Sequence, residues 1–511
     1  MKKQGLAIST MTSTIGSVMT RLLGMWAMIY ISNKIGPEGM GLYHLTTTIY
    51  SMAYMIASAG IITSVSRLVA EELSRGWGYR ARKTMNIFFV LGIVVSTIIS
   101  GVVFVYAESI SMFVIKDART VLGLRVLSLS IPFMTVSACF KGYFYAVKKV
   151  VKPASADVLE QIAKLLLITY FLQKFAPRGI DYACGAIGLG ITIGEMISFT
   201  YMFVLYLLDK ERKMDKGVRV SEEGILFKIL KVLLPISVTA YLGSVFMLLE
   251  NTLIPEGLRR SGLSAEAAMS MYGMIKGMVY PILFFPTALL SACSTILTPE
   301  IARARSLKYQ ERIEITSGRM IHFTMILAMF VVGVFSNYGQ ELGLLIYDNA
   351  QVGKLLEILV LMTPFMYMEI VVDGILKGLG EQNSCLRYRI IDSIFRVALI
   401  YWLIPMEGVS AFIGITLISN VLTSVLNLRR LIKVTEIRVN VNKWISYPAL
   451  SGIAAGMVSK VFVLYMIPRT LDLFARVMIG IGVASCLYGV FLFWIESLTR
   501  EDLSVMSISR R

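Results

Sequence analysis

Apolar and polar residues follow a coarse pattern along the chain, in which apolar runs of about 20 residues are separated by short polar segments. A run of that length crosses a bilayer of roughly 30 Å as an α-helix. No polar segment is longer than about 25 residues, which is too short for a soluble domain. We therefore predict an all-α polytopic membrane protein with about fourteen transmembrane helices. The expected helices cover residues 8–32, 41–66, 84–106, 121–146, 155–174, 181–208, 229–254, 269–297, 319–338, 355–376, 386–404, 408–428, 445–466 and 473–496.

Two regions of the chain repeat one another at a constant separation. The repeat covers two apolar segments and the polar link between them, which is hard to obtain by chance. Such a pattern indicates an internal duplication, and duplicated membrane proteins are commonly transporters. The matched pairs, each 232 positions apart, are Pro132/Pro364, Gly142/Gly374, Glu160/Asp392, Ile162/Ile394, Lys164/Arg396 and Leu167/Leu399.

The duplication also predicts the domain organisation. Upstream residues repeat at an offset of 229, as in Glu71/Glu300, so the second half has three extra residues in a loop. Each half holds six predicted helices, and an even number makes the two repeats cross the membrane in the same direction. We expect a first lobe at 1–215, a second lobe at 216–435, and two additional helices with a tail at 436–511.

The distribution of charge predicts the orientation. The chain is 56% hydrophobic and 16% charged, with a mean hydropathy of +0.70 and a net charge of +17. Alternate connecting segments hold roughly 33 Lys and Arg on one side against roughly 11 on the other, so we expect both termini in the cytoplasm. These basic residues are spread over eight short segments, which favours contact with an anionic membrane leaflet over nucleic-acid binding.

Cysteine and histidine content limits the chemistry of the protein. The five cysteines lie singly in or at the ends of apolar segments, and none has the spacing of a metal ligand. Two histidines leave little room for catalysis based on that residue. We therefore expect no metal, no cofactor and no enzymatic activity.

Charged residues inside the apolar segments are the candidate functional residues, because a charge at bilayer depth costs several kcal/mol unless it is paired or hydrated. Glu160/Lys164 and Asp392/Arg396 are acid–base pairs four positions apart, which places both members on one helix face. Their recurrence in both halves favours structural ion pairs over substrate chemistry.

Four further charged residues are candidates for ion coupling or for lining a cavity. Lys141 and Glu195 lie in the predicted fourth and sixth helices. Glu369 and Asp373 are like charges four positions apart, with Lys377 extending the same face, so one carboxylate is expected to be protonated or bound to an ion.

Arg21 and Lys276 have no acidic residue three or four positions away. An arginine keeps its proton, so Arg21 must face water, a partner helix or an anion. Lys276 could also extend to the interface or lose its proton. One such cation in each half predicts a shared anionic ligand, whereas Glu250 is expected at the surface.

Three segments resemble the multidrug/oligosaccharidyl-lipid/polysaccharide (MOP) exporter superfamily, and in particular its stage V sporulation protein B branch, which is related to the lipid II flippase MurJ. They are STIGSVMTRLLGMWAMIYISNKIGPEGMGLYHL, SAGIITSVSRLVAEELSRG and KGMVYPILFFPTALLSACSTILTPEIARA. The resemblance extends over essentially the whole chain. It implies fourteen helices, with the two six-helix lobes forming a V in the bacterial cytoplasmic membrane.

The resemblance also implies a function. Arg21 and Lys276 match family cations thought to face the pyrophosphate of an undecaprenyl-linked sugar. Ala27 replaces a second basic residue of the first helix, and the basic pair of the second helix is missing from YSMAYMIAS, so this cavity is less cationic than in the lipid II flippases.

We expect an alternating-access flippase for an anionic polyprenyl-linked saccharide, a peptidoglycan precursor for the spore cortex. Its prenyl tail would follow a groove made by the last two helices, as the resemblance implies. A multidrug or cation antiporter of the same superfamily is the first alternative, which Glu195, Glu369 and Asp373 support. A membrane-embedded glycosyltransferase or polymerase is the second.

Overall fold

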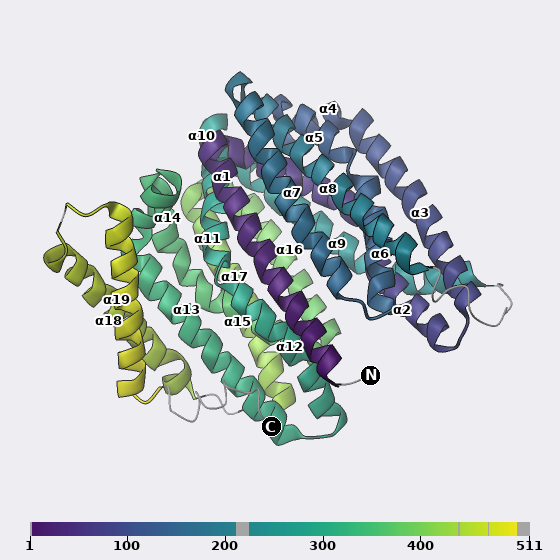
Figure 1. Cartoon of the computed structure of the whole chain (residues 1–511). Coiled ribbons are helices and arrows are strands. Elements are labelled where there is room, and N and C mark those ends of the chain that lie inside the picture. The colour runs from purple at the N-terminus through teal and green to yellow at the C-terminus, as the bar shows by residue number, and fades with distance from the viewer. Residues whose placement is uncertain (1–2, 211–223, 438–439, 469, 498–511) are drawn as a thin grey trace. The chain divides into compact units, whose positions relative to one another are not determined.

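A computed structural model describes residues 3–210, 224–437, 440–468 and 470–497 of the chain (Figure 1). Within these ranges almost every residue is helical, and no strand occurs. The prediction of an all-α membrane protein is therefore confirmed. The chain forms two compact units, Met1–Gly277 and Met278–Arg511.

Nine helices of the described residues are long and apolar enough to cross a membrane, or eleven if two bent helix pairs each count as one span. One of the nine is Gly16–Ser74, with 59 residues. It would be roughly 90 Å long if straight, about three times the bilayer core, but its backbone leaves the helical region at Gly36 (φ 70°), just before Pro37. The number of fourteen spans stays a prediction.

In the first unit, long helices pack around an aromatic core. Phe88 of α3, Phe140 and Tyr143 of α6 and Tyr206 of α8 are buried together beside α2. These rings pair at centroid distances of 5.0 Å for Phe140 with Tyr206 and 5.1 Å for Tyr143 with Tyr206. The helices of the unit are α1 (Lys3–Ser58), α2 (Ile61–Ser74), α3 (Gly78–Val105), α4 (Ala107–Ile110), α5 (Val121–Ser128), α6 (Ile131–Ala146), α7 (Val151–Phe175), α8 (Ile180–Lys210), α9 (Ile225–Arg260) and α10 (Ala265–Gly273).

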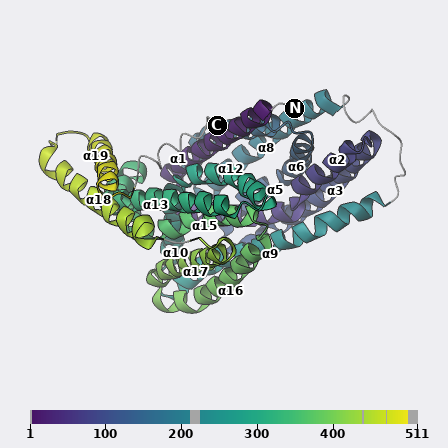
Figure 2. The ribbon, with the colours of Figure 1, turned by 90° about the horizontal axis from the view of Figure 1, so that it is seen from below.

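In the second unit, α18 and α19 lie side by side and pack against α13 (Figure 1, Figure 2). Gly452 and Gly456 of α18 meet Gly333 of α13 so closely that a Cβ atom on any of the three would overlap backbone of the other helix. Small residues at this spacing let membrane helices approach to backbone contact. The helices are α11 (Tyr280–Phe284), α12 (Thr287–Ser306), α13 (Gln310–Tyr347), α14 (Ala350–Leu359), α15 (Thr363–Gly378), α16 (Gln382–Glu407), α17 (Val409–Thr435), α18 (Tyr447–Met466) and α19 (Leu473–Trp494).

The helix bounds reproduce the duplication. Helices α6 and α15 begin and end 232 positions apart, and the last residues of α7 and α16 have the same separation. Gly142 of α6 packs on Val65 of α2, and Gly374 of α15 packs on Ser294 of α12. Val65 and Ser294 are 229 positions apart, as the upstream repeat predicts.

The compact units and the repeats have different boundaries. Helices α9 and α10 pack on α1, and α9 also contacts α2 and α3, so they join the first unit although they follow residue 215. The predicted lobe boundary at 215 lies outside the described residues. The division into lobes at 215 and 435 stays a prediction.

Candidate functional site

The two cations predicted to hold an anion have different surroundings. Arg21 lies on α1, and its side chain is exposed. Lys276 lies in a π-helical turn, Met274–Val279, and only 10% of its side chain is exposed. Irregular turns of this kind are frequent at functional sites.

The expectation that Lys276 is isolated is wrong. Its Nζ atom lies 2.8 Å from Oε1 of Glu250 on α9, and the Glu250 side chain is 17% exposed. The expected surface position of Glu250 is therefore also wrong. Glu250 is 26 positions from Lys276 and lies on another helix. The spacing of charged residues within one helix therefore does not predict this pair.

Further polar side chains gather around this ion pair on α1, α9 and α10. His44 Nδ1 lies 3.0 Å from the Tyr272 hydroxyl, and the two rings meet edge to face. Asn251 donates to the Thr48 hydroxyl at 3.1 Å. We call this set the Lys276 cluster; its members are His44, Thr48, Glu250, Asn251, Tyr272 and Lys276.

Glycine packing brings the members of the Lys276 cluster together. A Cβ atom at Gly273 of α10 would lie 2.6 Å from the backbone nitrogen of Gly41 on α1. The two helices therefore touch backbone to backbone, with His44 one turn after Gly41 and Tyr272 just before Gly273. His44 and Tyr272 were not among the predicted site residues, although their four-residue spacing from Thr48 and Lys276 places polar side chains on one face of each helix.

A second group of charges lies on α6, α7 and α8. Lys164 contacts Glu160 at 2.7 Å and Glu195 at 2.5 Å. Lys141 contacts Asp157 at 2.6 Å and Glu160 at 3.8 Å. Glu160/Lys164 is thus the ion pair that the spacing predicts, but it does not stand alone. Lys141 and Glu195, predicted as candidates apart from this pair, belong to the same group of charges. We call it the Lys164 cluster; its members are Lys141, Asp157, Glu160, Lys164 and Glu195.

The second half contains a related arrangement with reversed signs. Asp373 and Arg389 lie 3.9 Å apart and occupy the positions equivalent to Lys141 and Asp157. Asp392 contacts Arg396 at 2.8 Å and accepts a hydrogen bond from Ser419 at 2.5 Å. Both halves therefore keep an ion pair at these two equivalent positions, but the acidic and basic residues have changed places.

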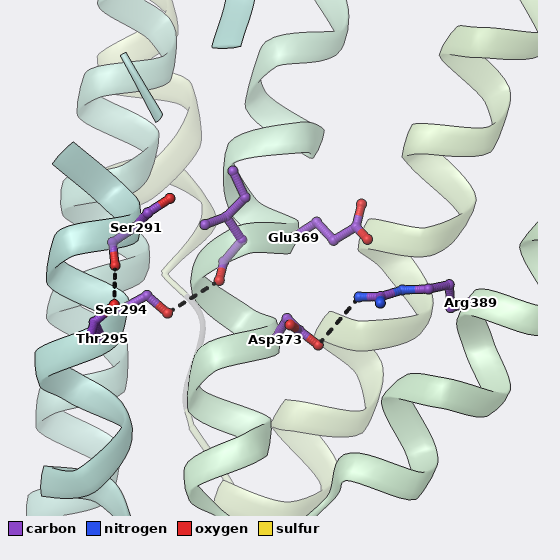
Figure 3. A pocket seen from close by; sticks show the side chains of 7 residues that line it. Ser291, Ser294, Thr295, Glu369, Asp373 and Arg389 are labelled. Carbon is purple, nitrogen blue, oxygen red and sulfur yellow. Dashed lines mark hydrogen bonds and ion pairs between the residues drawn. The ribbon is translucent and has the colours of Figure 1, made fainter. Parts of the chain in front are cut away.

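A cavity of about 300 Å³ lies between α12, α15 and α16 of the second unit. Glu369 and Asp373 project from α15 toward the side on which Arg389 of α16 lies (Figure 3). Asp373 also contacts Lys377 at 2.6 Å. Among the described residues, Glu369 makes no hydrogen bond or ion pair. The lining residues are Ser291, Ser294, Thr295, Glu369, Ile370, Asp373 and Arg389.

Three residues that line this cavity differ from their equivalents in the first half, and two of them replace apolar residues. Ile62, Val65 and Ser137 occupy the positions equivalent to Ser291, Ser294 and Glu369. Carboxylate and hydroxyl oxygens together suit a proton or a hard cation. No group of three or more His, Cys, Asp or Glu among the described residues has the geometry to hold a metal ion.

Comparison with known proteins shows similarity over most of the chain. The family described as "Polysaccharide biosynthesis protein" matches residues 6–255. The chain is 23% identical to stage V sporulation protein B of Bacillus subtilis (strain 168) over 452 residues, 87% of each protein. It is 26% identical to the lipid II flippase MurJ of the same strain over 217 residues, 40% of this chain and 39% of that one.

Solved structures show the same fold. The inward closed conformation of lipid II flippase MurJ matches with a TM-score of 0.69 at 12% identity, covering 95% of this chain and 99% of that one. The inward-facing conformation of a MATE family transporter matches with a TM-score of 0.64 at 14% identity, covering 84% and 100%. The predicted resemblance is therefore confirmed, and the fold is that of a multi-pass membrane transporter.

Proposed function

Since the chain is a member of the MOP exporter superfamily, in the branch of stage V sporulation protein B, we propose that it is a flippase for an anionic polyprenyl-linked saccharide. The substrate is a peptidoglycan precursor, and the process it serves is synthesis of the spore cortex. The protein lies in the bacterial cytoplasmic membrane with both termini in the cytoplasm, and it carries out no covalent chemistry.

The observation that supports this proposal best is the Lys276–Glu250 ion pair. Lys276 is the cation expected to bind the substrate diphosphate. In this structure its Nζ atom is already paired with Oε1 of Glu250 at 2.8 Å. An entering diphosphate must therefore compete with Glu250, which has the same sign of charge. Because the partners lie on different helices, exchanging Glu250 for the substrate separates α9 from the π-helical turn after α10.

This exchange provides a physical basis for alternating access. A substrate shifts a conformational equilibrium only if it binds the two states with different affinity. A Lys276 that pairs with Glu250 in one state and with substrate in the other meets that condition. Arg21 contributes an exposed and permanently charged guanidinium, which binds a phosphate through two parallel hydrogen bonds.

The test is a transport assay in proteoliposomes with a labelled undecaprenyl-linked saccharide. Arg21→Ala and Lys276→Ala should each reduce transport at least tenfold, because each removes a charge-assisted contact to the diphosphate. Lys174→Ala, at the exposed end of α7, is the matched control and should transport normally. Wild-type rates for both Arg21→Ala and Lys276→Ala would refute the anion site. Ethidium efflux without lipid movement would favour the antiporter, and sugar transfer would favour the enzyme.

The cavity beside Glu369 supports a role in coupling. Among the described residues this carboxylate makes no hydrogen bond or ion pair, and it lines a cavity that three hydroxyl side chains of α12 also line, so it is suited to take up a proton or a monovalent cation during the transport cycle. Glu369→Gln should abolish the dependence of transport on an imposed proton or sodium gradient. The control is Lys354→Gln, which removes an exposed charge from α14, outside the cavity lining. If Glu369→Gln keeps the gradient dependence of the wild type, Glu369 is not the coupling group.

A further inference from the structure

A second, smaller cavity lies where α13, α18 and α19 meet in the second unit. Its volume is about 70 Å³, several times what one water molecule needs. Three charged side chains line it, Glu341 of α13, Lys460 of α18 and Arg476 of α19, and most of the remaining lining is aliphatic. These residues are separate from the cations of the proposed transport site.

Two polar atoms that line this cavity are buried without a hydrogen-bond partner. They are Nε of Arg476 and Oε2 of Glu341. Among the described residues, Arg476 makes no ion pair. Buried polar groups are almost always satisfied, and leaving a buried N–H or carboxylate oxygen without a hydrogen bond is costly. One donor and one acceptor therefore await a ligand on the wall of the same cavity.

The charge of the cavity selects an anion. Lys460 pairs with Glu341 and lies 4.9 Å from the centroid of the Tyr338 ring, so the Lys460 charge is balanced. Arg476 is not balanced, and it lies in the first turn of α19, where the helix dipole adds positive potential. A ligand must offer an anionic acceptor to Arg476 and a hydroxyl donor to Glu341.

The surroundings indicate that this anion belongs to a lipid. The cavity lies beside the connection between α18 and α19, and several apolar side chains of that region are exposed. Tyr465 is 83% exposed, Met466 72% and Phe474 55%. Aromatic and basic side chains at the ends of membrane helices lie at the level of the lipid head groups.

We propose that this cavity binds the head group of a hydroxyl-bearing anionic phospholipid such as phosphatidylglycerol. The phosphate accepts hydrogen bonds from Arg476 and Lys460, and a head-group hydroxyl donates to Glu341. The acyl chains follow the apolar face of α18 and α19. Backbone contact between α18 and α13 at Gly333, described above, holds the cavity in shape before the lipid binds.

Native mass spectrometry of the full chain in detergent tests the site directly. Added phosphatidylglycerol should give a one-lipid complex, whereas phosphatidylcholine, whose head group has no hydroxyl and no net charge, should bind at least tenfold more weakly. Arg476→Gln should weaken phosphatidylglycerol binding about tenfold, because it removes a charge-assisted hydrogen bond. Glu341→Gln should leave binding equal or stronger, because it removes a competing negative charge while keeping an acceptor.

Arg178→Gln, at an exposed arginine in the 3₁₀ turn Ala176–Arg178 after α7, is the matched control and should bind as the wild type does. Thermal unfolding without lipid separates binding from folding, since Arg476→Gln should melt no lower than the wild type yet lose the stabilisation by phosphatidylglycerol. Equal binding of both lipids, or normal phosphatidylglycerol binding by Arg476→Gln, would overturn the proposal. Inorganic phosphate that protects as well as the lipid would identify a small-anion site instead.

Discussion

Replacing Lys164 with methionine should destabilise the first unit, because Lys164 balances two buried carboxylates. It contacts Glu160 at 2.7 Å and Glu195 at 2.5 Å, and the three side chains are 16%, 12% and 3% exposed. At an effective dielectric constant of about 20, each contact is worth about 6 kcal/mol of gross attraction. The cost of desolvating the charges offsets much of that attraction, so the net loss is about 3–5 kcal/mol.

The neighbouring charges determine how other substitutions compare. Lys141 lies 3.8 Å from Glu160 and still balances it, so Glu195 becomes the uncompensated charge in Lys164→Met. Glu195→Gln alone leaves two ammonium groups against two carboxylates and should cost only about 1 kcal/mol. Combining Glu195→Gln with Lys164→Met should recover part of the loss, because the two residues are energetically coupled.

The assay is heating in detergent followed by gel filtration of the protein that remains monodisperse. If the unit Met1–Gly277 unfolds cooperatively, Lys164→Met should lower the midpoint by about 5–9 °C. Glu195→Gln should lower it by about 2 °C. The reasoning is refuted if Lys164→Met melts with the wild type, or if Glu195→Gln is equally destabilising.

Three further variants test other contacts. Gly273→Ala should destabilise the α1–α10 contact by about 1–3 kcal/mol and lower transport, because its Cβ would overlap the α1 backbone. Lys141→Asp should prevent stable folding, whereas Lys141→Asp with Asp157→Arg, the arrangement of the second half, should restore a monodisperse protein. Hydrogen bonds from Arg430 hold the pKa of Glu381 below its usual range, so this pair stabilises above about pH 4.5 and less as pH falls further; Arg430→Gln should remove that acid sensitivity of the melting midpoint.

Each of these variants has a matched control. Gly101→Ala places a methyl group where nothing lies within 4 Å, and it should melt as the wild type does. The single variant Asp157→Arg should be less destabilised than Lys141→Asp, because it sets three cations against Glu160 and Glu195, whereas Lys141→Asp leaves four carboxylates against Lys164 alone. Arg387→Gln, at an arginine on α16 that stacks over Tyr388, should keep the acid sensitivity. Normal behaviour of the test variants, or failure of the controls, would contradict the contacts described.

Features that depend only on residues near one another in the sequence were predicted correctly. A continuous apolar run of about 20 residues becomes a helix in a membrane, because a helix satisfies every backbone hydrogen bond within the one segment. A repeat at a constant offset must preserve helix bounds, as α6 and α15 do. The ion pair of Asp392 with Arg396 followed from the four-residue spacing of one helix turn.

Contacts between different helices could not be predicted from the spacing of residues in the sequence. Glu250 reaches Lys276 across 26 positions, and Glu195 reaches Lys164 across 31. Nothing in the spacing of one helix says which face of another it will meet. The repeat aligns Lys141 with Asp373. That each belongs to an ion pair became visible only in the structure, where Asp157 lies beside Lys141 and Arg389 beside Asp373.

The amino-acid sequence by itself therefore determined that this is a duplicated helical membrane protein with charges in its apolar segments. Only the tertiary structure decided which of those charges are balanced and by which partners. The physical reason is that a membrane helix satisfies its own backbone, so its existence is a local property. Its buried charges are satisfied by side chains on other helices, and the contacts of Gly41 with α10 and Gly333 with α18 exist only once those helices pack.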